Sequence, residues 1–235
     1  MKSNESDLDI SILSAKCAGN YNRIAKRIIG MVLAIPILII LMPIMLFISI
    51  MIFIESGMPI FYRAQRGGTH GKPFKIYKFR TMIKNADRIG PGTTALNDDR
   101  VTSFGKILRK TKLDEIPQLI NIIKGEMCFI GPRPELLRYT KNYDELEKYI
   151  LEVRPGITDF SSLEFISLDE IVGNANPDAV YETCVLKKKN RLRLKYVATL
   201  SFWTDLKLFL RTVYGVMLKI GKLILKNKKA GQWNT

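Results

Sequence analysis

The stretch IIGMVLAIPILIILMPIMLFISIMIFI, residues 28–54, contains no charged side chain. As a helix it would be about 40 Å long, which exceeds the roughly 30 Å hydrocarbon thickness of a bilayer. The stretch is too long for the core of a signal peptide, and it lacks a small-residue cleavage site. We therefore expect it to remain in the mature protein as a membrane segment.

Basic residues flank this segment on both sides. Four precede it: Lys16, Arg23, Lys26 and Arg27. After it, residues 59–84 contain several Lys and Arg and no acidic residue. Because cytoplasmic flanks are enriched in Lys and Arg, both ends are expected in the cytoplasm. Pro36 and Pro43 offer break points for a hairpin that enters and leaves one leaflet, but a proline-kinked span is also tolerated by membranes. From these residues alone, hairpin and span are equally favoured.

Composition limits the remaining possibilities. The 235 residues suffice for one main globular unit with an appendage. The net charge of +15 and the pI of about 9.7 favour a polyanionic partner, which is a nucleic acid, an anionic membrane surface or a phosphorylated substrate. Cys17, Cys128 and Cys184 form no CxxC pair, which indicates a reducing compartment without structural disulfides. His70 is the single histidine, so a zinc site is not expected.

The sequence beyond the membrane segment predicts short secondary-structure elements. Residues 1–20 are polar and predict a loose tail or a surface helix. IFYRAQ, residues 60–65, predicts a short strand between turn-rich sequences. FKIYKFRTM, residues 74–82, alternates well enough for a strand, but Lys75 and Lys78 would also share a helix face, so its type stays open.

The sequence TKLDEIPQLINIIKGE, residues 111–126, joins two adjacent carboxylates to an apolar helical pattern. Pro117 has no backbone N–H and fits only within the first turn, so the helix is expected to begin at about Asp114. Asp114 and Glu115 would then occupy the N-cap and the first helical position, where carboxylates commonly cap free N–H groups. Taken alone, the pattern favours capping over catalysis.

Nearby cations change this interpretation. Four precede the carboxylates closely: Lys106, Arg109, Lys110 and Lys112. Downstream, Arg133 lies between two prolines in GPRPE, and such a braced guanidinium suits capture of a phosphate, although a surface ion pair is an equally good explanation in isolation. An ionised Asp114 among cations can attack phosphorus, and Glu115 can help to hold Mg²⁺, which takes one or two carboxylates together with substrate phosphates.

Several motifs follow one another in a characteristic order: KRIIGMVLAIPILIILMPIMLFISIMIF, PIFYRAQRGG, GKPFKIYKFRTM, FGKILRKTKLDEIPQLINIIKGEMCFIGPRPE and VRPGIT. In order and spacing they resemble the bacterial sugar transferases that start polysaccharide and glycan assembly, the monotopic phosphoglycosyl transferases. The resemblance covers residues 23–218. It implies a mostly helical α/β fold with a small sheet, in which a re-entrant membrane helix precedes a catalytic domain with amphipathic interfacial helices on the cytoplasmic face of the bacterial inner membrane.

The resemblance suggests four segments. These are an N-terminal tail (1–22), the re-entrant helix hairpin (23–57), the catalytic domain (58–200) and an amphipathic basic helix with a tail (201–235). The break in the family's membrane helix matches Pro43, which favours the hairpin over the span. A homodimer is a further candidate assembly.

The resemblance also implies roles for individual residues. Asp114 matches the aspartate that attacks the sugar-bearing phosphate of a UDP-sugar and releases UMP, and Glu115 matches the second residue of this Mg²⁺-assisted dyad. Undecaprenyl phosphate then accepts the phosphosugar, which is the first membrane step of exopolysaccharide, lipopolysaccharide or capsule assembly. The family's basic motifs match five residues that we expect to bind substrate: Lys78, Arg80, Arg109, Arg133 and Arg154.

The C-terminal sequence SFWTDLKLFLRTVYGVMLKIGKLILKNKK, residues 201–229, predicts an amphipathic basic helix. Its apolar residues alternate spacings of three and four: Trp203, Leu206, Leu210, Val213, Met217, Ile220 and Ile224. Its basic residues include Lys207, Arg211, Lys219, Lys222 and Lys226. Lying on an anionic leaflet is favoured over packing as an ordinary core helix.

Two positions depart from the family pattern. Gly30 stands where the family has an Asp after Lys-Arg, so a carboxylate contact expected to anchor the membrane segment is absent. After RPGIT the chain has DFSSLEF, residues 159–165, in place of a GWAQVNG-like run, which leaves the donor sugar unassigned.

Two other functions fit part of the sequence. A membrane-associated glycosyltransferase would transfer the sugar alone and release UDP. A non-catalytic basic scaffold or nucleic-acid-binding protein is supported only by the charge of +15. Because no aromatic-interleaved nucleic-acid motif accompanies this charge, we expect no nucleic-acid partner.

Overall fold

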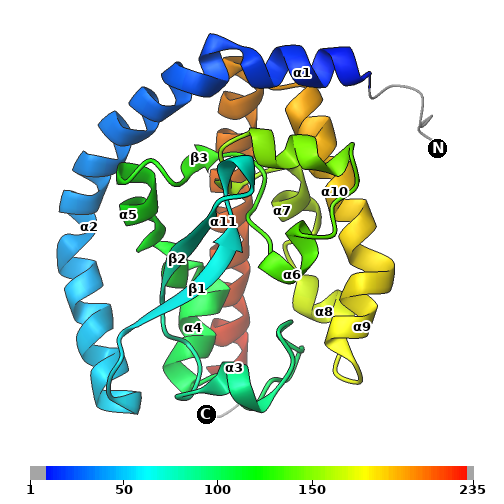
Figure 1. The fold of residues 1–235 in the computed structure, drawn as a ribbon. Helices are drawn as coiled ribbons and strands as arrows, with labels where there is room; N and C mark the ends of the chain where they lie inside the picture. The colour runs from blue at the N-terminus through cyan, green and yellow to red at the C-terminus, as the bar shows by residue number, and fades with distance from the viewer. Residues whose placement is uncertain (1–8, 232–235) are drawn as a thin grey trace.

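Figure 1 shows the computed structural model, which describes residues 9–231 apart from the side chains of residues 219, 220 and 222–231. Part of the predicted N-terminal tail, the last residues of the C-terminal tail and five side chains of the C-terminal pattern therefore lie outside the described residues. These five are Lys219, Ile220, Lys222, Ile224 and Lys226.

The N-terminal elements form a continuous arch around one side of the molecule (Figure 1). The arch consists of α1 (Ile10–Ala18), the π-helical turn η2 (Tyr21–Ala25) and α2 (Lys26–Ser56). Asp9 caps α1 by accepting the backbone N–H of Ser11 at 2.8 Å. Leu13 is completely buried in the core, so the polar start of the chain includes a helix that packs on the domain.

One face of α2 packs on the domain along the whole helix. Its buried residues recur at helical spacing and are Lys26, Gly30, Ala34, Ile48 and Ile52. The opposite face is apolar and exposed. By length and composition, the helix from Tyr21 to Ser56 is the one stretch among the described residues that could cross a membrane.

The structure corrects the expected break at Pro43. The helix continues through Pro36 and Pro43, and Figure 1 shows α2 bowed around the domain instead of folded back on itself. Both prolines lie on the exposed face, where each removes a backbone hydrogen bond without disturbing the packed face. Contacts along the inner face hold both halves of the helix against the domain, and a hairpin would break them.

Two small sheets confirm the expectation of a mostly helical fold with little sheet. β1 (Phe61–Gly67) and β2 (Pro73–Phe79) pair antiparallel, with the short helix η3 (Thr69–Gly71) at the turn. The segment whose type the sequence left open is thus a strand as far as Phe79, and Phe74 and Ile76 point from it into the core. β3 (Cys128–Ile130) and β4 (Gly156–Thr158) form a parallel pair.

Short helices connect the strands. Between β2 and β3 lie α3 (Ala86–Ile89), α4 (Ser103–Thr111), η4 (Leu113–Glu115) and α5 (Gln118–Ile123). Between β3 and β4 lie α6 (Leu137–Thr140) and η5 (Glu147–Glu152). The chain ends with α7 (Phe160–Glu164), α8 (Leu168–Val172), α9 (Pro177–Val180), η6 (Tyr181–Val185), α10 (Leu186–Ala198) and α11 (Phe202–Gly231).

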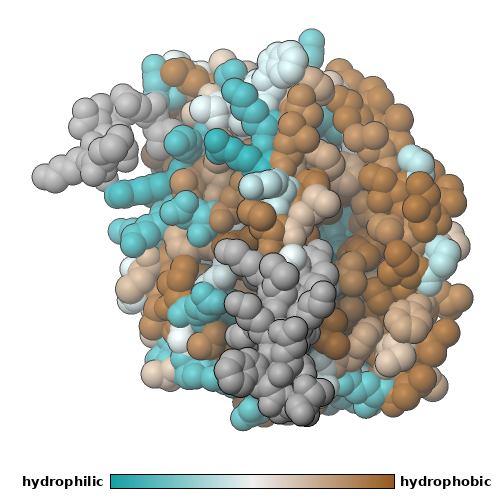
Figure 2. Space-filling model, turned by 180° about the vertical axis from the view of Figure 1, so that it is seen from behind, coloured by the Kyte–Doolittle hydropathy of each residue, from teal (hydrophilic) through white to brown (hydrophobic). Residues whose placement is uncertain are grey.

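The largest core cluster lies where α1, α10 and α11 meet β3. It includes Leu13, Ile130, Tyr196, Val197 and Leu208. α11 runs behind the strands in Figure 1, and its exposed residues include Trp203, Leu210 and Tyr214. Seen from behind, hydrophobic side chains gather over α2 and reach towards the centre of this face (Figure 2). The fold therefore leaves a broad apolar surface at its side and rear.

Candidate active site

Asp114 and Glu115 lie in a tight turn between two helices. After α4, Lys112 adopts a left-handed conformation with φ of 61°, and η4 then carries both carboxylates. α5 begins only at Gln118, with Pro117 at its N-cap. The expected helix start at Asp114 is therefore wrong, because the left-handed Lys112 and the 3₁₀ turn redirect the chain before the helix begins. No side chain caps η4 or α5, so capping does not explain the carboxylates.

Glu115 holds two of the predicted substrate-binding cations. Its Oε1 accepts hydrogen bonds from Lys78 Nζ at 3.0 Å and from Arg133 Nη2, and its Oε2 accepts from Arg133 Nη1 at 3.1 Å. Burial opposes ionisation of Glu115, but Arg133 and Lys78 outweigh it and hold its pKa well below the usual range. Glu115 thus favours the ionised form and holds Arg133 and Lys78 by hydrogen bonds.

Asp114 is equally buried but lacks such partners. The residue is 7% exposed, and its Oδ1 is buried without a hydrogen-bond partner among residues 9–231. Burial raises the pKa of Asp114 above its ordinary value, and Lys78 is the cation that opposes this effect most. Among the eight buried side-chain atoms of the described residues that lack a partner, Asp114 Oδ1 is the single carboxylate oxygen, and such an atom requires an explanation. A reacting group or an ion at Asp114 Oδ1 would provide one.

Two further cations stand near the carboxylates. Arg109 donates from Nε to Thr81 Oγ1 at 2.8 Å and from Nη1 to Thr94 Oγ1 at 2.9 Å. Burial lowers the pKa of Arg109, which Asp114 opposes most, and the pKa of Lys112, which Glu115 opposes more than Asp114 does. Neither side chain makes an ion pair within the described part of the chain. The site therefore combines two carboxylates with four cations, a surplus of positive charge that suits a polyanionic ligand.

Arg133 still has binding capacity while it contacts Glu115. It uses three hydrogen bonds, two to Glu115 and one from Nη1 to Ile157 O at 2.7 Å. A guanidinium has five N–H donors, so two remain for a phosphate. The flanking Pro132 and Pro134 restrict the backbone on either side. Arg133 is thus an oriented guanidinium with two unused donors.

Two other predicted substrate-binding residues do not contact the carboxylates. Arg80 donates from Nη2 to Ser56 O at 2.8 Å and to Gly57 O at 2.7 Å, and so it closes the C-terminal end of α2. Arg154 precedes β4. Its Nε donates to Gly125 O at 2.9 Å, and it lines a cavity of about 520 Å³ together with His70 and other residues.

Asp159 also lies beside Arg133, although its sequence position did not indicate this. This completely buried residue accepts the backbone N–H of Arg133 at 3.3 Å and the hydroxyl of Ser161 at 2.8 Å. It follows β4 directly, just as the GPRP segment follows β3. Asp159 drew attention only as a departure from the family pattern, and the parallel pairing of two three-residue strands left no periodic signal that would link it to Arg133.

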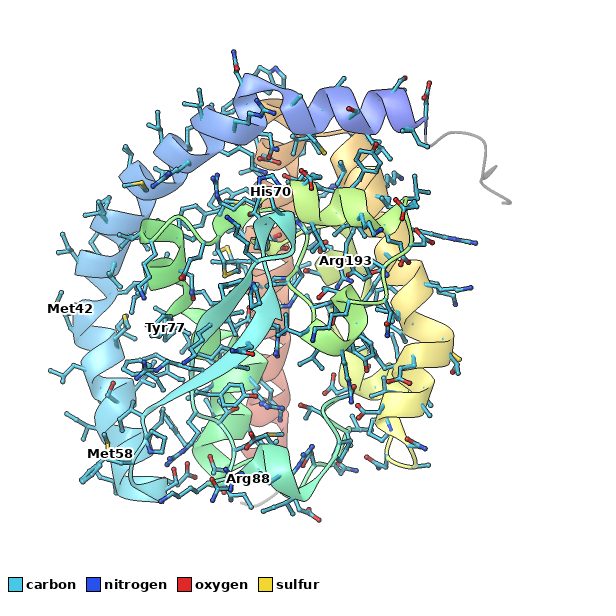
Figure 3. All side chains as sticks on the ribbon, viewed as in Figure 1. Met42, Met58, His70, Tyr77, Arg88 and Arg193 are labelled. Carbon is cyan, nitrogen blue, oxygen red and sulfur yellow. The ribbon has the colours of Figure 1, made fainter. Side chains whose placement is uncertain are left out.

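A second buried ion pair supports the same segment. Arg193 Nη2 donates to Glu135 Oε1 at 2.6 Å, and Tyr181 donates its hydroxyl to the same oxygen. Arg193 is completely buried and lies in the interior in Figure 3. Its position in the basic run from Lys187 to Lys195 gave no hint of this role, because such runs usually form solvated faces.

The carboxylates fit a Mg²⁺ ion only in combination with a ligand. Among residues 9–231, no group of three or more His, Cys, Asp or Glu side chains is placed to hold a metal. Asp114 Oδ1 has no partner, and Glu115 Oε2 accepts a single hydrogen bond and keeps a free lone pair. Mg²⁺ typically binds one or two carboxylates plus substrate phosphates and water. Asp114 and Glu115 meet this requirement.

Comparison with known proteins agrees with this geometry. The model of the family described as bacterial sugar transferase matches residues 21–219. The uncharacterized sugar transferase EpsL of Bacillus subtilis is 35% identical over 198 residues, which cover 84% of this chain and 90% of EpsL. The UDP-glucose:undecaprenyl-phosphate glucose-1-phosphate transferase of Escherichia coli is 36% identical over 82% of this chain. The undecaprenyl-phosphate galactose phosphotransferase of Salmonella typhimurium is 33% identical over 87% of this chain.

The chain spans less than half of two of these relatives. The aligned region covers 40% of the Escherichia coli protein and 43% of the Salmonella typhimurium protein. These two relatives are named for glucose and galactose, respectively, at similar identity to this chain. Overall similarity therefore does not identify a donor sugar.

Proposed function

The chain is an enzyme of the bacterial sugar transferase family, and from this premise we propose that it moves a sugar-1-phosphate from a UDP-sugar to undecaprenyl phosphate and releases UMP. The observation that carries the proposal is the pairing of a buried, unpartnered Asp114 oxygen with an adjacent Glu115 that orients Arg133 and Lys78. The first side chain is free to react, and the second places cations where phosphate charge must be neutralised.

The first step is attack on the donor. A carboxylate oxygen of Asp114 forms a bond to the sugar-bearing phosphorus, and the bond between this phosphorus and the oxygen of UMP breaks. UMP leaves with the electron pair, and an acyl phosphate that carries the sugar remains on Asp114. Nearby Lys78, Lys112 and Arg109 favour the ionised carboxylate that this step requires.

The second step transfers the phosphosugar to the lipid. A phosphate oxygen of undecaprenyl phosphate attacks the same phosphorus, and the bond to Asp114 breaks and restores the carboxylate. The two remaining donors of Arg133, together with Lys78, stabilise the phosphoryl oxygens in both steps, because phosphoryl transfer depends mainly on positioning and charge neutralisation. Mg²⁺ held by Asp114, Glu115 and the substrate phosphates would add to this neutralisation.

The lipid acceptor requires that the site face a membrane. α2 and α11 carry the exposed apolar residues at the side and rear of the molecule. We place these helices in the cytoplasmic leaflet of the bacterial inner membrane, with the apolar face of α2 immersed and its inner face on the domain. In this arrangement both ends of α2 stay on the cytoplasmic side without a hairpin.

Nucleotide release from a panel of UDP-sugars tests the proposed function. The protein in lipid nanodiscs receives one UDP-sugar, undecaprenyl phosphate and Mg²⁺, and UMP and UDP are separated by chromatography. We expect UMP with at least one donor, and no UMP from Asp114→Asn. Release of UDP would instead indicate transfer of the sugar alone, and UMP from Asp114→Asn would contradict the assigned nucleophile.

A further inference from the structure

A buried ion pair lies outside the candidate active site, where α2 and α11 begin. Lys26, the first residue of α2, pairs with Asp205 in the first turn of α11, and Nζ and Oδ2 are 3.1 Å apart. The side chains are only 3% and 11% exposed. Lys26 therefore does not act as a surface charge beside the membrane segment, as the flanking pattern suggested.

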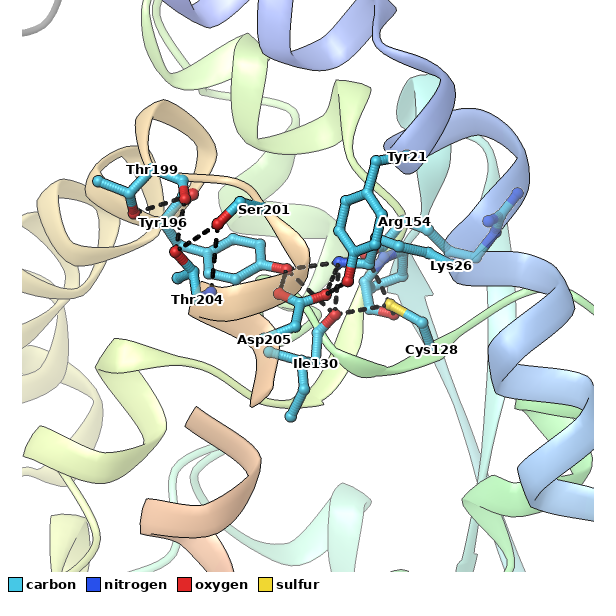
Figure 4. Close-up of polar contacts among 11 residues, drawn as sticks. Tyr21, Lys26, Cys128, Ile130, Arg154, Tyr196, Thr199, Ser201, Thr204 and Asp205 are labelled. Atoms are coloured by element: carbon cyan, nitrogen blue, oxygen red, sulfur yellow. Dashed lines mark hydrogen bonds and ion pairs between the residues drawn. The ribbon is translucent and has the colours of Figure 1, made fainter. Parts of the chain in front are cut away.

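All three donors of the Lys26 ammonium group and both carboxylate oxygens of Asp205 take part in polar contacts (Figure 4). The ammonium group of Lys26 has three donors and three acceptors: Asp205 Oδ2, the hydroxyl of Tyr196, and Ile130 O at 2.8 Å. Asp205 in turn accepts the hydroxyl of Tyr196 at 2.6 Å and that of Tyr21 at 2.7 Å. The network thus connects α2, α10, α11 and β3 at one point.

Stability alone does not account for such a pair. Bringing both charges out of water costs about as much as their attraction returns, and apolar replacements of both partners are often neutral or stabilising. Loss of one partner is strongly destabilising, because the other charge stays buried. The pair thus enforces one arrangement of these elements more than it stabilises the protein.

The third acceptor of Lys26, the carbonyl oxygen of Ile130, lies shortly before Arg133 in the chain, and Arg133 belongs to the candidate active site. Ile130 is the last residue of β3, and Gly131, Pro132 and Arg133 follow it directly. Gly131 fits tightly, since a Cβ there would lie 2.5 Å from Arg154 O. With proline on both sides of Arg133, this short segment has little freedom to absorb a shift of the Ile130 carbonyl. A displacement at Lys26 is therefore passed on to Arg133.

We propose that Lys26 is a positioning residue that couples the seating of α2 and α11 in lipid to the placement of Arg133. The inference rests on the proposed function, because Arg133 matters as a phosphate ligand of that reaction. Both helices expose apolar residues close in sequence to the Lys26–Asp205 ion pair, such as Ile28 on α2 and Trp203 on α11. When lipid keeps both helices in place, the Lys26–Asp205 ion pair keeps the end of β3 in place. When lipid does not constrain the helices, Arg133 loses its fixed position relative to Glu115.

A charge-neutral pair variant separates positioning from stability. Lys26→Met with Asp205→Asn removes both charges, while the amide keeps an oxygen that accepts one tyrosine hydroxyl and an NH2 group that can donate to the other. Arg27→Met is the matched control, because it removes one cation from the same helical turn, and Arg27 is exposed. The measurements are the thermal unfolding midpoint, kcat and KM for the donor in nanodiscs and in detergent micelles, and hydrogen exchange of the peptide that covers residues 128–135.

We expect the pair variant to unfold near the parent's temperature but to show a KM for the donor raised about tenfold or more, since small misplacements of a positioning group are costly. Amide hydrogen exchange at residues 131–133 should be faster in the pair variant than in the parent. The parent should bind its donor more tightly in nanodiscs than in micelles, and the variant should lose this difference. Parent-like KM and parent-like exchange in the folded pair variant would overturn the inference.

Two further outcomes remain informative. If the pair variant does not fold, Lys26→Arg replaces it, because a guanidinium keeps the charge but not the three contacts of the ammonium, and the same rise in KM and in exchange is expected. If the parent itself releases no UMP from any donor, the proposed function fails, and hydrogen exchange alone then decides whether Lys26 controls the segment before Arg133.

Discussion

Adjacent carboxylates in one turn have opposite properties because their neighbours differ. Glu115 faces Arg133 and Lys78 and stays ionised, whereas Asp114 has a raised pKa and an unpartnered oxygen. This contrast is the basis for the proposal that Asp114 reacts and that Glu115 orients the cations, in the way that paired acids divide their roles in other enzymes.

Replacement of Glu115 tests this division at the residue scale. Glu115→Gln keeps the shape but removes the charge that holds Arg133 and Lys78, and we expect kcat to fall by about 100- to 1000-fold, the loss typical of a misplaced electrostatic group. Steady-state UMP release measures the effect. Glu164→Gln is the control, since Glu164 is exposed. Activity close to that of the parent in Glu115→Gln would show that Arg133 is placed by other contacts.

The ion pair between Glu135 and Arg193 predicts a pH dependence of stability. Burial opposes ionisation of Glu135, but Arg193 and Lys189 lower its pKa from 4.5 to about 2. The folded protein thus binds this proton less readily than the unfolded chain. The contribution of Glu135 to stability is fully present above about pH 4.5 and is lost as the pH falls to about 2.

Glu135→Gln should remove this dependence. At pH 7 the variant leaves the buried Arg193 without an ionised partner, and we expect a loss of about 3–5 kcal/mol in the free energy of unfolding. Urea unfolding at several pH values provides the measurement. Glu145→Gln is the control, because the Glu145 side chain is 92% exposed in its ion pair with Lys148. Equal stability of Glu135→Gln and the parent at pH 7 would contradict the assigned pair.

At the scale of elements, α2 behaves as a helix with one protein face and one apolar outer face. Ile48 is 2% exposed and Ile54 is 71% exposed. We expect Ile48→Ala to lower the free energy of unfolding by about 2–5 kcal/mol, because it leaves a cavity in the core. Ile54→Ala should change it by no more than about 0.5 kcal/mol. Urea unfolding in detergent compares the two, and similar losses would mean that α2 does not present a single packed face.

Element types were predictable where the signal was local. The length and composition of residues 28–54 identified the long apolar helix, and alternation favoured the strand that ends at Phe79. The bow of α2 through Pro43 was not predictable, because it depends on contacts along the inner face. The start of α5 was missed for a different reason, since the left-handed Lys112 has no distinctive sequence signal.

Motif matching located the site better than it assigned individual cations. Lys78 and Arg133 do meet Glu115, whereas Arg80 closes the end of α2 and Arg154 faces another cavity. All four residues belong to family motifs, so the sequence does not distinguish those that contact Glu115 from those that do not. The three-dimensional structure makes this distinction. Asp159 and Lys26 contact important groups although no motif pointed to these contacts, because their partners lie far away in the sequence.

At the scale of the whole molecule, α11 and α2 are expected to hold the protein on the membrane. Trp203 and Leu210 are 68% and 58% exposed on α11. The double variant Trp203→Gln with Leu210→Gln should keep the parent's unfolding temperature but bind anionic vesicles more weakly, because apolar area is lost from the inserted face. Vesicle co-sedimentation measures this. Ile171→Gln is the control on α8, where Ile171 is 49% exposed, and an equal loss of binding in both variants would contradict the assigned face.

The proposed mechanism requires Asp114 to carry the phosphosugar between the two substrates. Intact-mass spectrometry of the protein with the donor that supports UMP release, and without undecaprenyl phosphate, tests this step. We expect a mass increase equal to one sugar phosphate, located on the peptide that contains Asp114, absent from Asp114→Asn and lost when undecaprenyl phosphate is added. An unmodified protein that nevertheless transfers phosphosugar, or an adduct on another residue, would contradict it.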